Sequence, residues 1–265
     1  MLTKDLREAR VYQEYELAGQ KYRAIKAVPD FSDLDLGASW VNIDPTLFHG
    51  MLLSVSIIDH ETKSIFVHGS AALTYSTYCL CATHVLQDYM DKIKQGLASV
   101  YLTGYYPKGP VMWQGTRFIG YRGLDIGLLE IIPTFKAEDV PVVICTEMEF
   151  KMPAVGDRIF ISGTIADEPE YSLNENKINP PAVQTRLCQG RVIDVYPNGR
   201  DRTFLPMPCF AVDTPSWGGM SGGPAFNGQG ELIGLISRSF DTAPTTVSLI
   251  PNPESALTEK MLRKD

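Results

Sequence analysis

Short apolar runs separated by turn residues fill the chain from position 51 onward. Clusters of Gly, Pro, Asn, Asp or Ser interrupt these runs, a pattern typical of β-strands joined by turns. The runs lie at 51–58, 64–68, 71–82, 98–104, 112–119, 124–132, 141–145, 157–163, 186–196, 206–213, 222–226, 231–238 and 245–250. So many short strands predict an all-β fold.

The two ends of the chain and one internal segment depart from this pattern. Apolar residues scattered among charges over 2–27 predict a helix, and the Pro, Asp and Gly residues of 28–48 predict an extended linker along the body. Residues 164–182 have little periodicity and predict a long exposed loop. The stretch 252–264 predicts a C-terminal helix, with Pro253 in its first turn.

Composition limits the classes of partner. With 265 residues, of which 44% are hydrophobic and 21% charged, the chain can bury a sizeable core. Its net charge of −7 argues against nucleic-acid binding through a basic surface. No apolar run reaches membrane-spanning length, and the charged start of the chain lacks a secretory apolar core. We therefore expect no membrane partner and, if Met1 is the native start, a cytoplasmic location.

The five cysteines predict free thiols rather than a disulfide framework. Their number is odd, and their spacing matches no zinc signature; they are Cys79, Cys81, Cys145, Cys188 and Cys209. Cys79 and Cys81 lie two apart in an apolar run, which directs both to the same face of a strand. We therefore expect buried thiols in a reducing compartment, with no metal and no cofactor.

Candidate chemistry is concentrated at 219–224, which read Gly-Met-Ser-Gly-Gly-Pro. Glycine allows tight backbone angles, so the amides of Gly219 and Ser221 can converge on one point. A serine hydroxyl needs a base to take its proton and amides to receive the developing negative charge. A glycine-rich turn is weak evidence by itself, and the function depends on a base and an acid elsewhere in the chain.

Both groups are present in a specific order. His84 ends a small, apolar, strand-like run, and Asp125 enters another apolar run, where a buried acid needs a partner such as a histidine N–H. The order His84, Asp125, Ser221 is that of chymotrypsin-type enzymes and differs from the subtilisin and α/β-hydrolase orders. Asp213 is the alternative acid, which we interpret as support for the loop before Ser221.

Several motifs then resemble those of the chymotrypsin/trypsin-like serine peptidases, most closely the compact bacterial peptidases with an HtrA/Deg-type protease domain. Residues 80–85 resemble the LTAAH-type stretch around the catalytic histidine, 125–129 resemble DIALL, and 219–224 resemble GDSGGP. The strand at 67–73 resembles the family's GSGF element. These motifs follow one another in register over roughly 48–250, which makes the resemblance specific.

The resemblance implies a chymotrypsin-like double β-barrel with the active site in the cleft between the barrels. It implies an N-terminal helical or extended extension over 1–45, a first β-barrel over 46–135, and a second β-barrel with a short C-terminal helix over 136–265. Few residues follow the last predicted strand, so we expect no downstream PDZ domain.

The resemblance also places residues of the second barrel around the substrate: Pro215, Ser216, Ser237, Arg238 and Ser239. Pro215 lies six residues before the nucleophile, where trypsin carries a specificity acid. A buried cation would have no partner there, so we expect small or medium uncharged P1 side chains. Arg238 is the one feature that would favour acidic groups. We expect Ser237 to pair with the substrate backbone and to hydrogen-bond Asp125.

These features predict a serine endopeptidase that acts on a protein or peptide substrate through an acyl-enzyme. Ser221 attacks, His84 accepts and returns the proton, Asp125 orients the imidazole, and the amides of Gly219 and Ser221 hold the oxyanion. One form of this hypothesis is a regulated cytosolic protease that cuts one partner, with 1–45 as its regulatory or docking segment. The alternative is a binding module that keeps the fold without the activity. The sequence does not indicate the oligomeric state.

Overall fold

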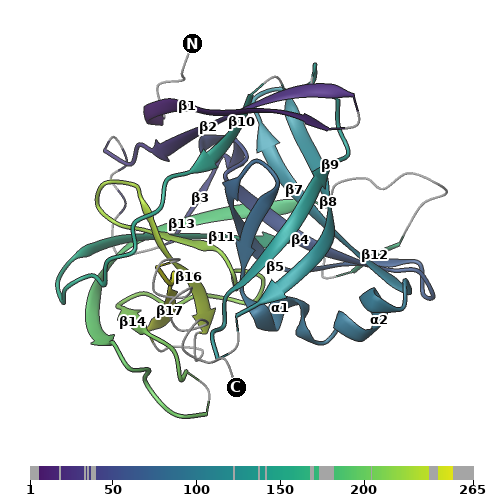
Figure 1. Ribbon diagram of the computed structural model, residues 1–265. Coiled ribbons are helices and arrows are strands. Elements are labelled where there is room, and N and C mark those ends of the chain that lie inside the picture. Colours follow the sequence, from purple (N-terminus) through teal and green to yellow (C-terminus); the bar gives the residue numbers. More distant parts are fainter. Residues whose placement is uncertain are drawn as a thin grey trace, which may run out of the picture.

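The computed structural model describes residues 6–17, 19–32, 34, 36, 40–121, 123–136, 138–140, 142–167, 170–172, 182–203, 205–238 and 244–252. Two closed β-barrels of six strands each make up most of this part of the chain, and a smaller sheet lies across one end of them (Figure 1). The prediction of an all-β double barrel is confirmed. The strands follow the apolar runs of the sequence closely.

The first barrel closes because its strand β6 pairs back onto β5. Its strands are antiparallel and run in the order β5-β4-β7-β8-β9-β6. They are β4 (Leu52–Asp59), β5 (Ser64–Tyr75), β6 (Tyr78–Cys81), β7 (Ala98–Tyr106), β8 (Gly109–Gly120) and β9 (Gly127–Pro133). The short helices α1 (Thr83–Gln87) and α2 (Met90–Lys94) follow β6, and the strand β12 (Glu170–Ser172) pairs with β5 at one edge.

The second barrel closes in the same way, through pairing of β11 with β13. Its order is β11-β15-β16-β17-β14-β13, again antiparallel. The strands are β11 (Arg158–Ala166), β13 (Val183–Tyr196), β14 (Cys209–Val212), β15 (Pro224–Phe226), β16 (Leu232–Arg238) and β17 (Thr245–Leu249). A short strand from the N-terminal region, β3 (Val41–Ile43), pairs with β13 and extends this sheet.

The prediction of a helix over 2–27 is wrong. Residues of this stretch form the hairpin strands β1 (Leu6–Leu17) and β2 (Gln20–Pro29), joined by a turn at Gly19 with φ +75°. The strand β10 (Val142–Thr146), between the barrels in the sequence, pairs with β2 in parallel and completes a three-stranded sheet. In β2, Lys21 and Arg23 are exposed while Tyr22 and Ala24 are buried, which is the period of a strand.

The segment 28–48 is more than a linker, because it places aromatic side chains between the barrels. The ring of Phe31 stacks on Phe160 of β11 with 4.4 Å between centroids, and Phe48 of the 3₁₀ turn η1 (Pro45–Phe48) stacks on Phe226 of β15 at 6.0 Å. Phe31 and Phe48 are buried in a cluster with residues of both barrels. Burial of one such side chain contributes about 1.5–3 kcal/mol, so this segment helps to fix the barrels relative to each other.

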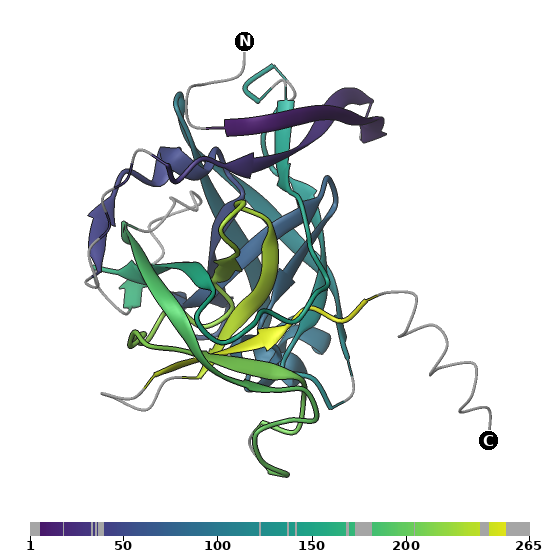
Figure 2. The same ribbon diagram turned by 90° about the vertical axis from the view of Figure 1, so that its left-hand side faces the viewer.

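Two sequence predictions fall wholly or partly outside the described residues: the C-terminal helix over 252–264 and most of the exposed loop over 164–182. Where it is described, that second stretch contains the end of β11 and the strand β12. None of the helices among the described residues is both long and apolar enough to cross a membrane. Figure 2 shows the molecule from the side, with the β1–β2 hairpin lying across its upper end.

Candidate active site

His84 lies where the first barrel meets the second, in the first turn of α1. Strand β6 is inserted between β5 and β9 and ends at Cys81, and α1 begins two residues later. The following side chains, Val85 and Leu86, are buried and anchor this turn in the barrel core. The His84 side chain itself remains 31% exposed, so its ring can reach a bound substrate.

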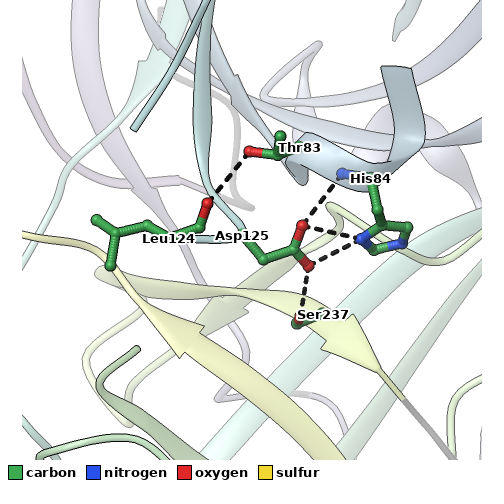
Figure 3. A network of polar contacts seen from close by, with 5 residues as sticks. All are labelled: Thr83, His84, Leu124, Asp125 and Ser237. Carbon is green, nitrogen blue, oxygen red and sulfur yellow. Dashed lines mark hydrogen bonds and ion pairs between the residues drawn. The ribbon is translucent and has the colours of Figure 1, made fainter. Parts of the chain in front are cut away.

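Asp125 lies just before β9 and faces His84. Its carboxylate accepts hydrogen bonds from the His84 backbone N–H at 3.1 Å and from the ring Nδ1 at 3.0 and 2.8 Å (Figure 3). The Ser237 hydroxyl of β16 donates at 2.5 Å to Oδ2 of Asp125, the same oxygen that lies 2.8 Å from Nδ1, and this is the contact expected from the sequence. The Asp125 side chain is only 13% exposed, so the histidine is held by an acid that is itself fixed from the second barrel.

The environment of Asp125 keeps it ionised and sets the tautomer of the histidine. Burial raises the pKa of Asp125, but hydrogen bonds from His84 and Ser237 outweigh burial, and its pKa falls below the ordinary value. An ionised carboxylate only accepts, so Nδ1 of His84 carries the proton in this pair. Nε2 of the neutral ring is then an acceptor, and it has no hydrogen-bond partner among the described residues.

Ser221 lies in the turn between β14 and β15, and two glycines shape that turn. Gly219 and Gly222 have φ values of +89° and +80°, which other residues rarely adopt. The amides of the residues around them are engaged: Met220 N–H donates to Trp217 at 3.1 Å, and Gly222 N–H donates to Ile236 at 2.7 Å. The amides at 219 and 221 have no hydrogen-bond partner among the described residues.

The turn lies directly against the first barrel. The Ser221 carbonyl accepts a hydrogen bond from the Ser70 backbone N–H at 2.8 Å. A Cβ on Gly222 would collide with the Ser70 carbonyl and would approach the backbone nitrogen of Ala82, two residues before His84. Glycine is therefore required at 222. Within the described part of the chain, no hydrogen bond joins His84 to Ser221.

The alternative acid, Asp213, is bonded to β13, and no hydrogen bond joins it to His84 among the described residues. Its carboxylate accepts a hydrogen bond from the Arg191 backbone N–H of β13 at 2.6 Å, and its own amide donates to the Arg191 carbonyl at 3.0 Å. This pairing holds the end of β14 against β13. It matches the interpretation of Asp213 as support for the loop.

Of the residues predicted around the substrate, the structure describes the contacts of some and not of others. The Pro215 backbone carbonyl accepts a hydrogen bond from the Trp40 indole, Ser216 is nearly buried, and Ser237 is buried against Asp125. Arg238 ends β16, and nothing is described of its side chain. Ser239 lies outside the described residues.

Sequence reasoning missed an aromatic cluster beside the serine turn. Trp217, four residues before Ser221, is 44% exposed and meets Trp40 edge-on at 5.4 Å between ring centroids. The Arg186 guanidinium lies over the Trp217 ring at 5.0 Å. The position of Trp217 next to the glycine turn was a usable signal. The contact between Trp217 and Trp40 could not be predicted from the sequence, because it joins segments that are far apart in the chain.

No group of three or more His, Cys, Asp or Glu side chains among the described residues could hold a metal ion. His84 and Asp125 form a hydrogen-bonded pair, and the five cysteines are free and buried. A histidine held by a carboxylate and a serine in a glycine-rich turn are groups that can carry out proton transfer and nucleophilic attack.

Comparisons with known proteins agree with this fold. A family model described as a trypsin-like peptidase domain matches residues 69–235, more than half of the chain. Among solved structures, "Crystal structure of Deg5" matches with a TM-score of 0.52 and 16% identity, covering 79% of this chain and 87% of that one. "Atomic resolution structure of HBP" matches with a TM-score of 0.54 and 14% identity, covering 86% and 98%.

At such low identities the two structures establish similarity of fold alone, and no curated protein matches the chain. The family model spans both barrels, from the β5 strand beside the serine turn to the β16 strand that carries Ser237. The chain belongs to the family of trypsin-like peptidase domains.

Proposed function

We propose that this protein is a serine endopeptidase that hydrolyses peptide bonds through an acyl-enzyme. The observation that carries the proposal is the hydrogen-bonded pair of His84 and Asp125, at 2.8 Å, next to a serine turn with two unpaired amides. A carboxylate that fixes a histidine tautomer and leaves Nε2 open is the arrangement that general-base activation of a serine requires.

In this mechanism the Ser221 Oγ attacks the carbonyl carbon of the scissile peptide while its proton moves to Nε2 of His84. The amides of Gly219 and Ser221 donate to the resulting oxyanion. His84 then returns the proton to the leaving amine, the C–N bond breaks, and an ester remains on Ser221. Water, deprotonated by the same nitrogen, attacks that ester and releases the acid product. Asp125 stays ionised throughout and stabilises the imidazolium.

A second candidate is a binding module with the same fold and no catalysis. The observation in its favour is that no hydrogen bond joins His84 to Ser221 in the described part of the chain. Such contacts are often long in peptidases without substrate and shorten on binding. Chemistry at Ser221 therefore distinguishes the two functions.

The test is covalent labelling by a fluorophosphonate probe together with hydrolysis of fluorescently labelled casein. The wild type should be labelled, and Ser221→Ala should not be. Ser221→Ala and His84→Ala should each lower hydrolysis by at least about 10⁴-fold, and the double variant should lose little more, because the two residues act as one unit. A wild type that folds but takes no label would favour the binding module, and losses that multiply in the double variant would contradict the assignment of Ser221 and His84 to one catalytic unit.

The same proposal includes a substrate class and a location. The residues expected around the P1 pocket, Thr214, Pro215 and Ser216, have no charged side chain. A buried Lys or Arg would have no partner there, which favours small or medium uncharged P1 residues. Five buried free thiols fit a reducing compartment such as the cytosol. A peptide library varied only at P1 tests the first point, and preferred cleavage after Lys or Arg would contradict it.

A further inference from the structure

Ser70 is a fully buried serine of β5 whose hydroxyl reaches the second barrel. Its Oγ lies 3.0 Å from the Gly219 carbonyl oxygen of the serine turn. The same Oγ lies 2.8 Å from the backbone nitrogen and 3.0 Å from the hydroxyl of Thr164 in β11. One side chain of the first barrel thus contacts both the wall of the second barrel and the turn that carries the nucleophile.

The direction of these hydrogen bonds follows from the donors and acceptors present. A carbonyl oxygen only accepts and a backbone N–H only donates, so Ser70 gives its single proton to Gly219 and accepts from the Thr164 amide. The Thr164 hydroxyl then donates into the remaining lone pair of Ser70. The proton and both lone pairs of the buried hydroxyl are therefore used. Because the contacts with Thr164 occupy the lone pairs, they direct the proton of Ser70 toward the Gly219 carbonyl.

Ser70 also binds the other end of the same segment. Its backbone N–H donates to the Ser221 carbonyl at 2.8 Å. One residue therefore holds the carbonyl groups of Gly219 and Ser221, the two residues of this turn whose amides have no partner among the described residues. Gly219 has no side chain to restrict its backbone, and its φ of +89° is one of several values open to glycine. The hydrogen bond from Ser70 supplies the missing restraint.

The geometry points to Ser70 as a positioning residue for the oxyanion-binding turn. By fixing the Gly219 carbonyl it limits rotation of the peptide units on either side, and so aims the amides at 219 and 221. This inference rests on the proposed peptidase function, because those amides matter only if an oxyanion forms. A hydroxyl that aims other donors acts on the rate of the chemical step and has little effect on binding of the substrate.

The chain offers a matched control. Ser54 of β4 pairs directly with Ser70 in the sheet, is equally buried, and its hydroxyl has no hydrogen-bond partner among the described residues. Ser54→Ala and Ser70→Ala therefore remove the same atom from neighbouring positions of one barrel. Thr164→Val removes the hydroxyl that orients Ser70 and keeps the bond from the Thr164 amide. Because it keeps that bond, it serves as the milder variant if Ser70→Ala does not fold.

The first measurement is the rate of fluorophosphonate labelling as a function of probe concentration, which separates the maximal rate from the half-saturating concentration. Each variant is assayed well below its own melting temperature. We expect Ser70→Ala to lower the maximal rate by about 10–100-fold and Thr164→Val by about 3–10-fold, because misplacement by an ångström can cost about 100-fold. The half-saturating concentration should stay within about threefold, and Ser54→Ala should match the wild type.

The second measurement, amide hydrogen exchange by NMR, does not need activity. In Ser70→Ala the amides of Met220 and Gly223, which donate within the turn, should exchange at least about tenfold faster, whereas Ser54→Ala should leave them unchanged. Unchanged exchange in both Ser70→Ala and Thr164→Val, or labelling within threefold of the wild type in both, would overturn the role of Ser70. An unlabelled wild type with the exchange difference present would contradict the proposed function alone.

Discussion

Asp125 is the residue through which the two barrels share one site. It comes from the first barrel together with His84, yet one of its oxygens is bound by Ser237 of the second barrel. The hydrogen bond from Ser237 is among the causes that lower the pKa of Asp125 against the effect of burial. Ser237 therefore both keeps the acid ionised and fixes the orientation of the histidine.

Replacing Ser237 with Ala should slow peptide hydrolysis without abolishing it. Hydrogen bonds to charged groups contribute about 1.5–3 kcal/mol, but Asp125 keeps its bonds from His84, so we expect kcat to fall about tenfold with KM within about threefold. Ser248→Ala is the control, because the hydroxyl of this buried serine of the adjacent strand β17 has no hydrogen-bond partner in the described part of the chain. Equal kcat in the two variants would contradict the role of Ser237.

The sequence indicates the residues that would carry out the chemistry, but not the residues that hold them in position. His84, Asp125 and Ser221 stand in recognisable motifs because their own side chains must have particular chemical types. The Ser70 hydroxyl and the Trp40 indole act through backbone carbonyls of distant loops, at Gly219 and Pro215. Every residue has a backbone carbonyl, so a contact of this kind does not depend on the type of the accepting residue. No local sequence pattern therefore indicates these contacts.

At the scale of elements, the strands of the barrels were predictable and the N-terminal hairpin was not. The barrel strands are apolar runs bounded by turn residues, so both the pattern of apolar residues and the length of each run indicate a strand. The helix prediction rests on apolar residues scattered among charges, whose spacing fits a helix imperfectly, whereas the alternating burial in β2 has the period of a strand. Besides β1, strand β2 pairs with β10, more than a hundred residues later in the sequence, and tertiary pairing of this kind overrides local preference.

The turn between β4 and β5 is bonded to the neighbouring helix α2. Asp59 accepts hydrogen bonds from the amides of Glu61 and Thr62, at 2.9 and 3.1 Å, and from the Lys92 ammonium of α2 at 2.7 Å. These bonds, that of Lys92 first, lower the pKa of Asp59 to about 2. The ionised carboxylate thus joins the hairpin turn to the helix that follows His84.

Stability should therefore depend on pH through this turn. Because the pKa of Asp59 is lower in the folded chain than in the unfolded chain, its contribution is present above the unfolded value of about 4 and is lost as the pH falls toward about 2. Asp59→Asn should melt at a lower temperature than the wild type near pH 6, and the gap should narrow on acidification. Asp91→Asn, at a 90% exposed side chain of α2, is the control. A gap independent of pH would contradict this account.

On the scale of the whole molecule, the N-terminal segment belongs to the core. Tyr22 of β2 is buried and donates a hydrogen bond to the Phe135 carbonyl at 3.0 Å, and its ring stacks on Tyr15. The hairpin pairs with β10 over the connection between the barrels, and Cys145 of β10 is fully buried there. Because each barrel supplies part of the candidate site, a segment that fixes the connection between them also supports the site.

Removal of residues 1–29 should expose that connection. Burial raises the pKa of the Cys145 thiol to about 12, so in the full chain it should react with a disulfide reagent such as DTNB only after unfolding, as should the other four buried thiols. In the truncated chain the paired edge and apolar cover of β10 are lost. We expect a lower melting temperature and one thiol that reacts rapidly in the native state. Cys145→Ser in the truncated chain should abolish that reaction. A truncated chain that melts like the full chain and whose thiols stay protected would show that the hairpin is only an appendage.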